Sequence, residues 1–174
     1  MNYATIKNCD IANGPGVRVS LFVSGCTHHC KGCFNAETWD FNFGEEVTDE
    51  HADQIIEYLK PSYIKGFSLL GGEPFEPCNQ RGLVGFLKRI KETYPEKTIW
   101  CYTGYLLDDE LLSESRARCE VTDEMLSYID ILVDGEFKQE LKDLRLRFRG
   151  SSNQRIIDLK ETLSGGEIVW WKEL

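Results

Sequence analysis

Hydrophobic and polar residues alternate along VRVSLFV, residues 17–23, and glycines flank the run on both sides. The residues that fall on one face of such an extended chain are Val17, Val19, Leu21 and Val23. A period of two combined with β-branched residues is typical of a strand with one buried face. The preceding NGPG predicts a type II turn, because Pro15 fixes φ and Gly16 accepts a positive φ.

Three later segments repeat their hydrophobic residues at helical spacing instead. The first predicted helix starts after Thr48, a suitable N-cap, has acidic residues in its first turn and ends before Pro61. The residues expected on the buried faces of the first two helices are Ala52, Ile55, Ile56 and Leu59, then Leu83, Phe86, Leu87 and Ile90. A third helix is predicted around Met125.

Short hydrophobic runs between these helices predict further strands at residues 66–70, 98–102 and 131–133. Strands that alternate with helices at this spacing predict βαβ units around a mostly parallel sheet, and therefore an α/β fold. The chain has 174 residues, no internal repeat and no interdomain linker, so we expect a single domain over residues 1–174.

Two other segments carry many charges. The acidic run at residues 108–124 is expected to be a solvated surface insertion. In LRLRFRG, residues 144–150, apolar residues alternate with Arg145, Arg147 and Arg149, which predicts a strand with one arginine face. Such a face either protects a solvated edge strand or docks onto an acidic partner.

Composition narrows the class of protein. The chain is 41% hydrophobic and 28% charged, as in ordinary globular proteins, and its net charge is −9. We expect no nucleic-acid partner, because an acidic chain gains nothing from phosphate contacts. The sequence has neither a signal-peptide pattern nor an apolar run that could span a bilayer, so we expect no membrane partner and a cytoplasmic protein. Seven cysteines in a reducing compartment argue against a disulfide framework.

Three cysteines near the end of the first predicted strand, Cys26, Cys30 and Cys33, form a C-x3-C-x2-C motif. Zinc could take these thiolates with His28 or His29 in a structural site, although the usual second cysteine pair is missing. Cys30 and Cys33 could instead form a redox pair, which leaves Cys26 unexplained. A 4Fe-4S cluster held by three thiolates is the third possibility, and it leaves one iron open to a substrate.

A second motif, GGEP at residues 71–74, ends the next predicted strand. Together the two motifs resemble those of the radical S-adenosylmethionine superfamily. The motifs GPG, LFVSGC, CFN, TW, YTG, ILVDG and RGSSNQ follow the order found in one branch, the activating proteins of anaerobic ribonucleoside-triphosphate reductase. The resemblance runs from Asn2 to about Arg155 and leaves residues 156–174 as a C-terminal extension. It implies a partial (β/α) barrel of the radical S-adenosylmethionine type, reduced in size.

The resemblance also implies a reaction. Cys26, Cys30 and Cys33 would ligate the cluster, and S-adenosylmethionine would chelate the open iron through its amine and carboxylate. An electron from the cluster would cleave the sulfonium, and the 5′-deoxyadenosyl radical would take a hydrogen from a glycine of the reductase large subunit. An electron donor such as a flavodoxin would be required. The alternatives are an activase of another glycyl-radical enzyme and a zinc-stabilised interaction module without catalysis.

The GGEP motif would contact the cofactor. Gly71 and Gly72 would let backbone carbonyls approach S-adenosylmethionine where a Cβ would clash. Those carbonyls could accept hydrogen bonds from the ammonium group of the cofactor, and Glu73 would add negative charge near it.

The residue before the last cysteine is usually aromatic in the superfamily and lies near the adenine, but here it is Gly32. The adenine contact would then fall to the backbone around Gly32, Cys33 and Phe34, with Phe34 as the aromatic neighbour. We expect His28 and His29 to pack beside the cluster or to bind backbone groups rather than iron.

The remaining candidates are weaker. The cysteines outside the motif, expected to be buried apolar thiols, are Cys9, Cys78, Cys101 and Cys119. Tyr102–Gly104 and Asp130 or Asp134 should lie at strand ends, where α/β sheets bind ligands. They could equally be turn and cap residues.

Overall fold

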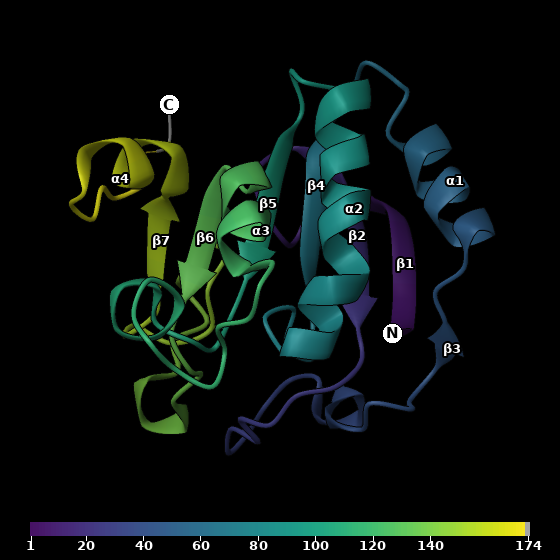
Figure 1. The fold of residues 1–174 in the computed structure, drawn as a ribbon. Helices are drawn as coiled ribbons and strands as arrows, with labels where there is room; N and C mark the ends of the chain where they lie inside the picture. The colour runs from purple at the N-terminus through teal and green to yellow at the C-terminus, as the bar shows by residue number, and fades with distance from the viewer. Residues whose placement is uncertain (173–174) are drawn as a thin grey trace.

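The structure is a computed structural model that describes residues 1–172, and one sheet with the strand order β3-β1-β2-β4-β5-β6-β7 runs through it (Figure 1). The strands are β1 (Asn2–Asp10), β2 (Val17–Val23), β3 (Glu45–Glu46), β4 (Ile64–Gly71), β5 (Thr98–Tyr102), β6 (Ile131–Asp134) and β7 (Arg155–Asp158). The α-helices are α1 (Asp49–Tyr58), α2 (Pro77–Thr93), α3 (Thr122–Tyr128) and α4 (Leu159–Gly165). Shorter helical segments are η1 (Ala36–Trp39), η2 (Leu107–Leu111) and η3 (Gln139–Leu141).

Four neighbouring strands in the centre of the sheet, β2, β4, β5 and β6, are parallel. β1 pairs antiparallel with β2, as a connection of only residues 11–16 requires, and β3 and β7 are also antiparallel to their neighbours. The sheet is therefore mixed: parallel pairing is confirmed for the four predicted strands, and the antiparallel pairs involve β1, β3 and β7, which were not predicted. β3 and β7 form the two edges of the sheet, which is open within the described residues.

The predicted central elements are confirmed with small differences at their ends. β2 covers residues 17–23, and Gly16 has the positive φ, +77°, that the predicted turn requires. At the start of α1 the His51 ring accepts a hydrogen bond from the backbone N–H of Thr48 at 3.0 Å, which supports the predicted cap. The hydrophobic pattern does not predict β1, β3, β7 or α4.

Helices α1, α2 and α3 cover one face of the sheet (Figure 1). Alternate strand residues point into this layer and are almost fully buried there: Val19, Leu21 and Val23 of β2, Phe67 and Leu69 of β4, and Ile99 and Cys101 of β5. They pack against Ile55, Leu83, Leu87, Ile90 and Met125 of the helices. This layer is the main hydrophobic core. Within residues 1–172 no helix has both the length and the hydrophobicity to cross a bilayer.

The opposite face of the sheet is covered only in part. Towards β6 and β7, Phe148 and Trp171 pack on Trp100, with ring centroids 5.4 and 5.1 Å from the Trp100 ring. The chain reaches this place because it returns beside β7 after α4, where the Trp171 N–H donates to the Ile156 carbonyl at 2.9 Å. The connection between β1 and β2 covers Arg18 and Ser68 of this face, through Pro15 and Asn13, and the part nearest the strand ends lines the pocket described below.

Two surface segments differ from their predictions. Within residues 108–124, Leu111 and Ala117 are fully buried in the main core, so this segment is more than a solvated insertion. Residues 144–150 form no strand, and the predicted arginine face is wrong. Asp143 accepts hydrogen bonds from the backbone and guanidinium N–H groups of Arg145, which starts a turn at that point.

Candidate functional site

A pocket of about 620 Å³ opens at the carboxyl ends of the parallel strands, the lower end of the sheet in Figure 1. Each of these strands contributes through residues at or just beyond its end: Cys26 after β2, Gly71, Gly72 and Glu73 at β4, Tyr102, Thr103 and Gly104 at β5, and Gly135 after β6. The pocket continues over the sheet face opposite the helices, where Phe22 and Leu70 line it. Its volume and its place at this edge are typical of small-molecule sites in α/β proteins.

The three motif cysteines all line this pocket and are free thiols. Cys26 is buried, while Cys30 and Cys33 are partly exposed. Burial raises the pKa of the Cys26 thiol to about 12. Burial, followed by the negative charge of Glu136, also raises the pKa of Cys30. Cys26 and Cys30 therefore hold their protons at neutral pH, and metal binding must release them.

The three thiols line one pocket without converging on a single point. Within residues 1–172, no three histidine, cysteine, aspartate or glutamate side chains converge as ligands of one metal ion. A tetrahedral zinc site needs such convergence. In a 4Fe-4S cluster each cysteine binds a different iron, so thiols that do not converge on one point are compatible with it.

The four cysteines outside the motif lie elsewhere. Cys101 is buried in the main core, as predicted, and Cys119 is partly buried. Cys9 and Cys78 are exposed, so their predicted burial is wrong. None of these four described residues lines the pocket, and none is placed to supply a fourth thiolate there.

Hydrogen bonds to neighbouring turns fix the start of the cysteine loop, residues 24–35. The Gly25 N–H donates to the Thr38 carbonyl of η1 at 2.7 Å. Thr27 donates through its backbone N–H and its hydroxyl to Oε1 of Glu76, at 2.9 and 2.6 Å. Because Glu76 precedes α2, this bond ties the loop to the start of that helix.

Both glycines of GGEP line the pocket, and both are sterically required by the chain itself. Gly71 has φ +114°, and a Cβ on it would lie 2.5 Å from the backbone N and O of Val23. A Cβ on Gly72 would lie 2.6 Å from the carbonyl oxygen of Gly25 and 2.9 Å from that of Thr38. These two glycines thus let the end of β4 pack closely against β2, η1 and the cysteine loop. The sequence did not predict this structural role.

Glu73 also lines the pocket, but its carboxylate is only 1% exposed and is fully engaged by the protein. Oε1 accepts from the Gly104 N–H at 2.7 Å and from His28 Nε2 at 2.8 Å. Oε2 accepts from the Phe75 N–H and the Thr103 hydroxyl, both at 2.8 Å. Glu73 therefore joins the ends of β4 and β5 to the cysteine loop.

His28 makes a contact that sequence reasoning missed. Its ring bridges two carboxylates, with Nε2 2.8 Å from Glu73 and Nδ1 2.9 Å from Glu136, and its side chain is only 3% exposed. Burial lowers the pKa of His28, but hydrogen bonds to the two carboxylates and their charges outweigh it and raise the pKa to about 9. The only sequence signal was a histidine between two motif cysteines in a chain that also carries an acid in GGEP.

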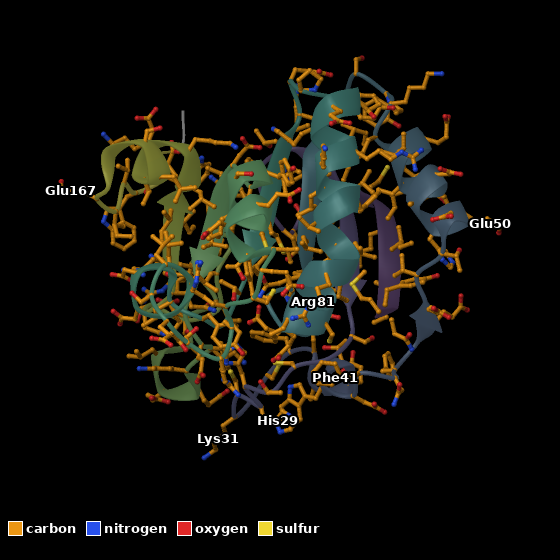
Figure 2. All side chains as sticks on the ribbon, in the orientation of Figure 1. His29, Lys31, Phe41, Glu50, Arg81 and Glu167 are labelled. Carbon is orange, nitrogen blue, oxygen red and sulfur yellow. The ribbon has the colours of Figure 1, made fainter. Side chains whose placement is uncertain are left out.

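His29 behaves differently from its neighbour. Its ring stacks on Trp39, with centroids 4.5 Å apart, and its backbone has φ +51°. Figure 2 shows His29 and Lys31 of this loop at the lower end of the molecule, with Lys31 extending away from the protein. The His28 ring thus binds carboxylates rather than backbone groups, whereas packing of either histidine beside a cluster stays a prediction.

The segment after β6 occupies the space beside Gly32. Gly32 has φ +76°, and a Cβ there would lie 2.0 Å from Oε1 of Gln139. Phe34 is 59% exposed and packs against Phe137, with ring centroids 5.1 Å apart, and Lys142 Nζ lies 5.2 Å from its ring centroid. Phe34 and Phe137 both line the pocket, so the aromatic neighbour predicted for a ligand has a second aromatic ring beside it.

The later motifs divide between pocket and scaffold. Tyr102 lines the pocket, as expected of a strand end. Asp130 lies before β6, at its amino end, where it accepts from Lys91 Nζ at 2.9 Å. Asp134 is buried and forms an ion pair with Arg155 at 2.6 Å. Neither aspartate is among the described residues that line the pocket, so the structural interpretation holds for both.

Comparisons with known proteins also point to a 4Fe-4S cluster. The family model described as 4Fe-4S single cluster domain matches residues 12–157. Three similar proteins carry the name anaerobic ribonucleoside-triphosphate reductase-activating protein. That of Haemophilus influenzae is 48% identical and that of Vibrio cholerae 46%, each over 90% of this chain and 97% of its own. That of Escherichia coli is 45% identical over 92% of this chain and 100% of its own.

Proposed function

The chain belongs to the family of anaerobic ribonucleoside-triphosphate reductase-activating proteins, and we propose that it activates such a reductase by generating a glycyl radical in it. The observation that supports this most directly is the pocket, in which three free cysteines and the GGEP motif meet at the carboxyl ends of parallel strands. We further propose that the fold is a reduced radical S-adenosylmethionine barrel, whose inner face is the sheet face opposite the helices.

Cys26, Cys30 and Cys33 would hold a 4Fe-4S cluster. Thiolates are the ligands that iron–sulfur clusters require, and these three differ from the other cysteines in lining one pocket. Three ligands for four irons leave one coordination position free, which is the property that separates catalytic metal sites from structural ones.

S-adenosylmethionine would occupy the pocket beside this cluster. A volume of about 620 Å³ suits a nucleoside-sized ligand. Gly71, Gly72 and Glu73 would border its methionyl end, while residues 32–34, with Phe34, would border its adenine. Since the Glu73 carboxylate is engaged by four protein donors, its negative charge would act on the ammonium group from a fixed position.

When bound, the reduced cluster and S-adenosylmethionine would supply the one-electron chemistry by which a reductase glycine loses a hydrogen atom. The protein's own residues orient these groups and keep water away. Cys26 is buried, and Phe22, Leu70 and Phe137 give the pocket apolar walls. A glycine fits as the target because no side chain shields its Cα hydrogen. The electron would come from a donor such as a flavodoxin, and the reaction would take place in the cytoplasm.

The test is to incubate anaerobically reconstituted protein with reductase, reductant and S-adenosylmethionine, using reductase grown on glycine deuterated at Cα. We expect a glycyl-radical signal and deuterium in the 5′-deoxyadenosine released. Cys30→Ala should abolish both signals, whereas Cys78→Ala, which changes an exposed cysteine outside the pocket, should preserve both. Unlabelled 5′-deoxyadenosine beside a full radical signal would overturn direct abstraction.

A further inference from the structure

The cysteine loop contains little regular structure that could hold its thiols in place. Between Cys26 and Cys30 the described chain has no helix or strand, and His29 adopts a left-handed conformation with φ +51°. The loop's own backbone contributes the turn bond from the Cys33 N–H to the Cys30 carbonyl at 3.1 Å. Backbone bonds from the Gly25 N–H to Thr38 and from the Cys26 N–H to Trp39 hold the start of the loop, so the chain from Thr27 to Cys30 must depend on side-chain anchors.

His28 is the most buried of these anchors. Its Nε2 lies 2.8 Å from Glu73 Oε1, and its ring packs edge-on against Tyr105 with centroids 4.4 Å apart. Gly104 leaves room for the ring, because a Cβ there would lie 2.7 Å from His28. The contact from Nε2 to Glu73, the inner arm of the bridge, thus holds the loop between the ends of β4 and β5.

The anchor at the other end of this arm is rigid. Glu73 is also held by Phe75, Thr103 and Gly104, so its carboxylate cannot follow the loop if the loop moves. The outer arm, from Nδ1 to Glu136, is different because the Glu136 side chain is 51% exposed. It connects the loop to the segment that follows β6 and carries Phe137, a pocket wall.

We propose that His28 is a positioning residue: by bridging Glu73 and Glu136 it fixes the chain between the first two cysteines relative to the pocket. The consequence for the cluster rests on the proposed function, whereas the restraint on the loop does not. Groups that orient metal ligands in this way commonly change metal affinity by about 10–100-fold when they are replaced.

Two substitutions separate the arms of the bridge. In His28→Gln the amide nitrogen can stand where Nε2 stood and keep the bond to Glu73, whereas in His28→Asn it can stand only where Nδ1 stood. His29→Gln is the matched control, since its ring lies in the same loop and makes no hydrogen bond among the described residues. Circular dichroism and thermal unfolding of the metal-free proteins establish that each variant folds.

The first measurement is hydrogen–deuterium exchange over residues 24–35 in the metal-free proteins. Exchange should be fastest in His28→Asn, intermediate in His28→Gln and unchanged in His29→Gln. The second measurement, on reconstituted proteins, is the rate of iron loss to a chelator together with the electron paramagnetic resonance spectrum of the reduced cluster. His28→Asn should lose iron about 10-fold faster or more and give an altered spectrum, while His29→Gln matches the wild type.

Wild-type loop exchange in folded His28→Asn would overturn the inference, as would wild-type iron loss combined with a wild-type spectrum. If His28→Asn does not fold, Glu136→Ala replaces it, because that side chain is half exposed. Unchanged loop exchange in Glu136→Ala and His28→Gln would then overturn the inference. A wild-type protein that assembles no cluster would refute the proposed function, and the exchange comparison would still decide the role of His28.

Discussion

Gly72 and Gly85 differ in what a methyl group would meet. At Gly72 a Cβ would lie 2.6 Å from the Gly25 carbonyl oxygen, and backbone cannot move aside as a flexible side chain can. Gly72→Ala should therefore displace the cysteine loop, destabilise the protein by about 1–3 kcal/mol and weaken both cluster retention and S-adenosylmethionine binding. Urea unfolding, iron analysis and calorimetry measure these three effects.

Gly85 is the control for this substitution. It lies inside α2, and a Cβ there would meet no described atom within 4 Å outside its own helix. Gly85→Ala should therefore stabilise the protein by about 0.5–1 kcal/mol through helix propensity. Iron content and cofactor binding should not change in this variant. If Gly72→Ala bound the cofactor weakly yet retained its cluster and its stability, Gly72 would face the ligand rather than the loop.

The sequence alone identified residues of the site but could not assign all their contacts. The spacing of Cys26, Cys30 and Cys33 sufficed to place them together, because few residues separate them. Glu73 and His28 are 45 positions apart, and no local pattern reports a bond over that separation. Glu73 was therefore expected beside the ligand, and its four protein donors could be seen only in the fold.

Among the elements, the sequence predicts the strands that carry a clear hydrophobic pattern and misses those that do not. β2 lies inside the sheet with one face on the helices, so its residues alternate clearly. β1 is flanked on one side only by the short strand β3, and most β1 residues are exposed or only partly buried. Its sequence therefore shows no alternation of hydrophobic and polar residues. Residues 144–150 show the reverse case, because they alternate in sequence but lie in turns.

The C-terminal segment is the element whose contribution is easiest to measure. Trp171 packs edge-on against Trp100, at 5.1 Å and 87°, and lies 6.2 Å from Phe148, a residue that lines the pocket. Trp171→Ala should lower the free energy of unfolding by about 1–3 kcal/mol, since the side chain is only partly buried. Trp170→Ala removes a 54% exposed ring and should change stability by about 0.5 kcal/mol or less.

Denaturant titration of the two tryptophan variants tests this difference. Because Phe148 loses one of its aromatic neighbours in Trp171→Ala, we also expect faster hydrogen exchange over residues 143–150 in that variant. Equal stabilities for Trp170→Ala and Trp171→Ala would show that packing of the Trp171 ring on Trp100 adds nothing beyond what the exposed Trp170 ring contributes.

For the molecule as a whole, the main core and the candidate site are separate layers. The core lies between the sheet and helices α1, α2 and α3, and none of the three motif cysteines belongs to it. The site lies at the end and on the other face of the same strands. A chain built in this way does not need the cluster to fold, unlike small zinc domains that have no sufficient core of their own.

Removal of iron should therefore leave a folded protein. After anaerobic chelation we expect an unchanged far-ultraviolet circular dichroism spectrum and a cooperative thermal transition, because the hydrogen bonds of Gly25 and Thr27 and the His28 bridge still hold the cysteine loop. Re-addition of iron and sulfide should restore the brown cluster without a refolding step. Loss of the cooperative transition on chelation would instead mean that the metal holds the fold together, as the zinc-stabilised alternative requires, and the separation of core and site would be refuted.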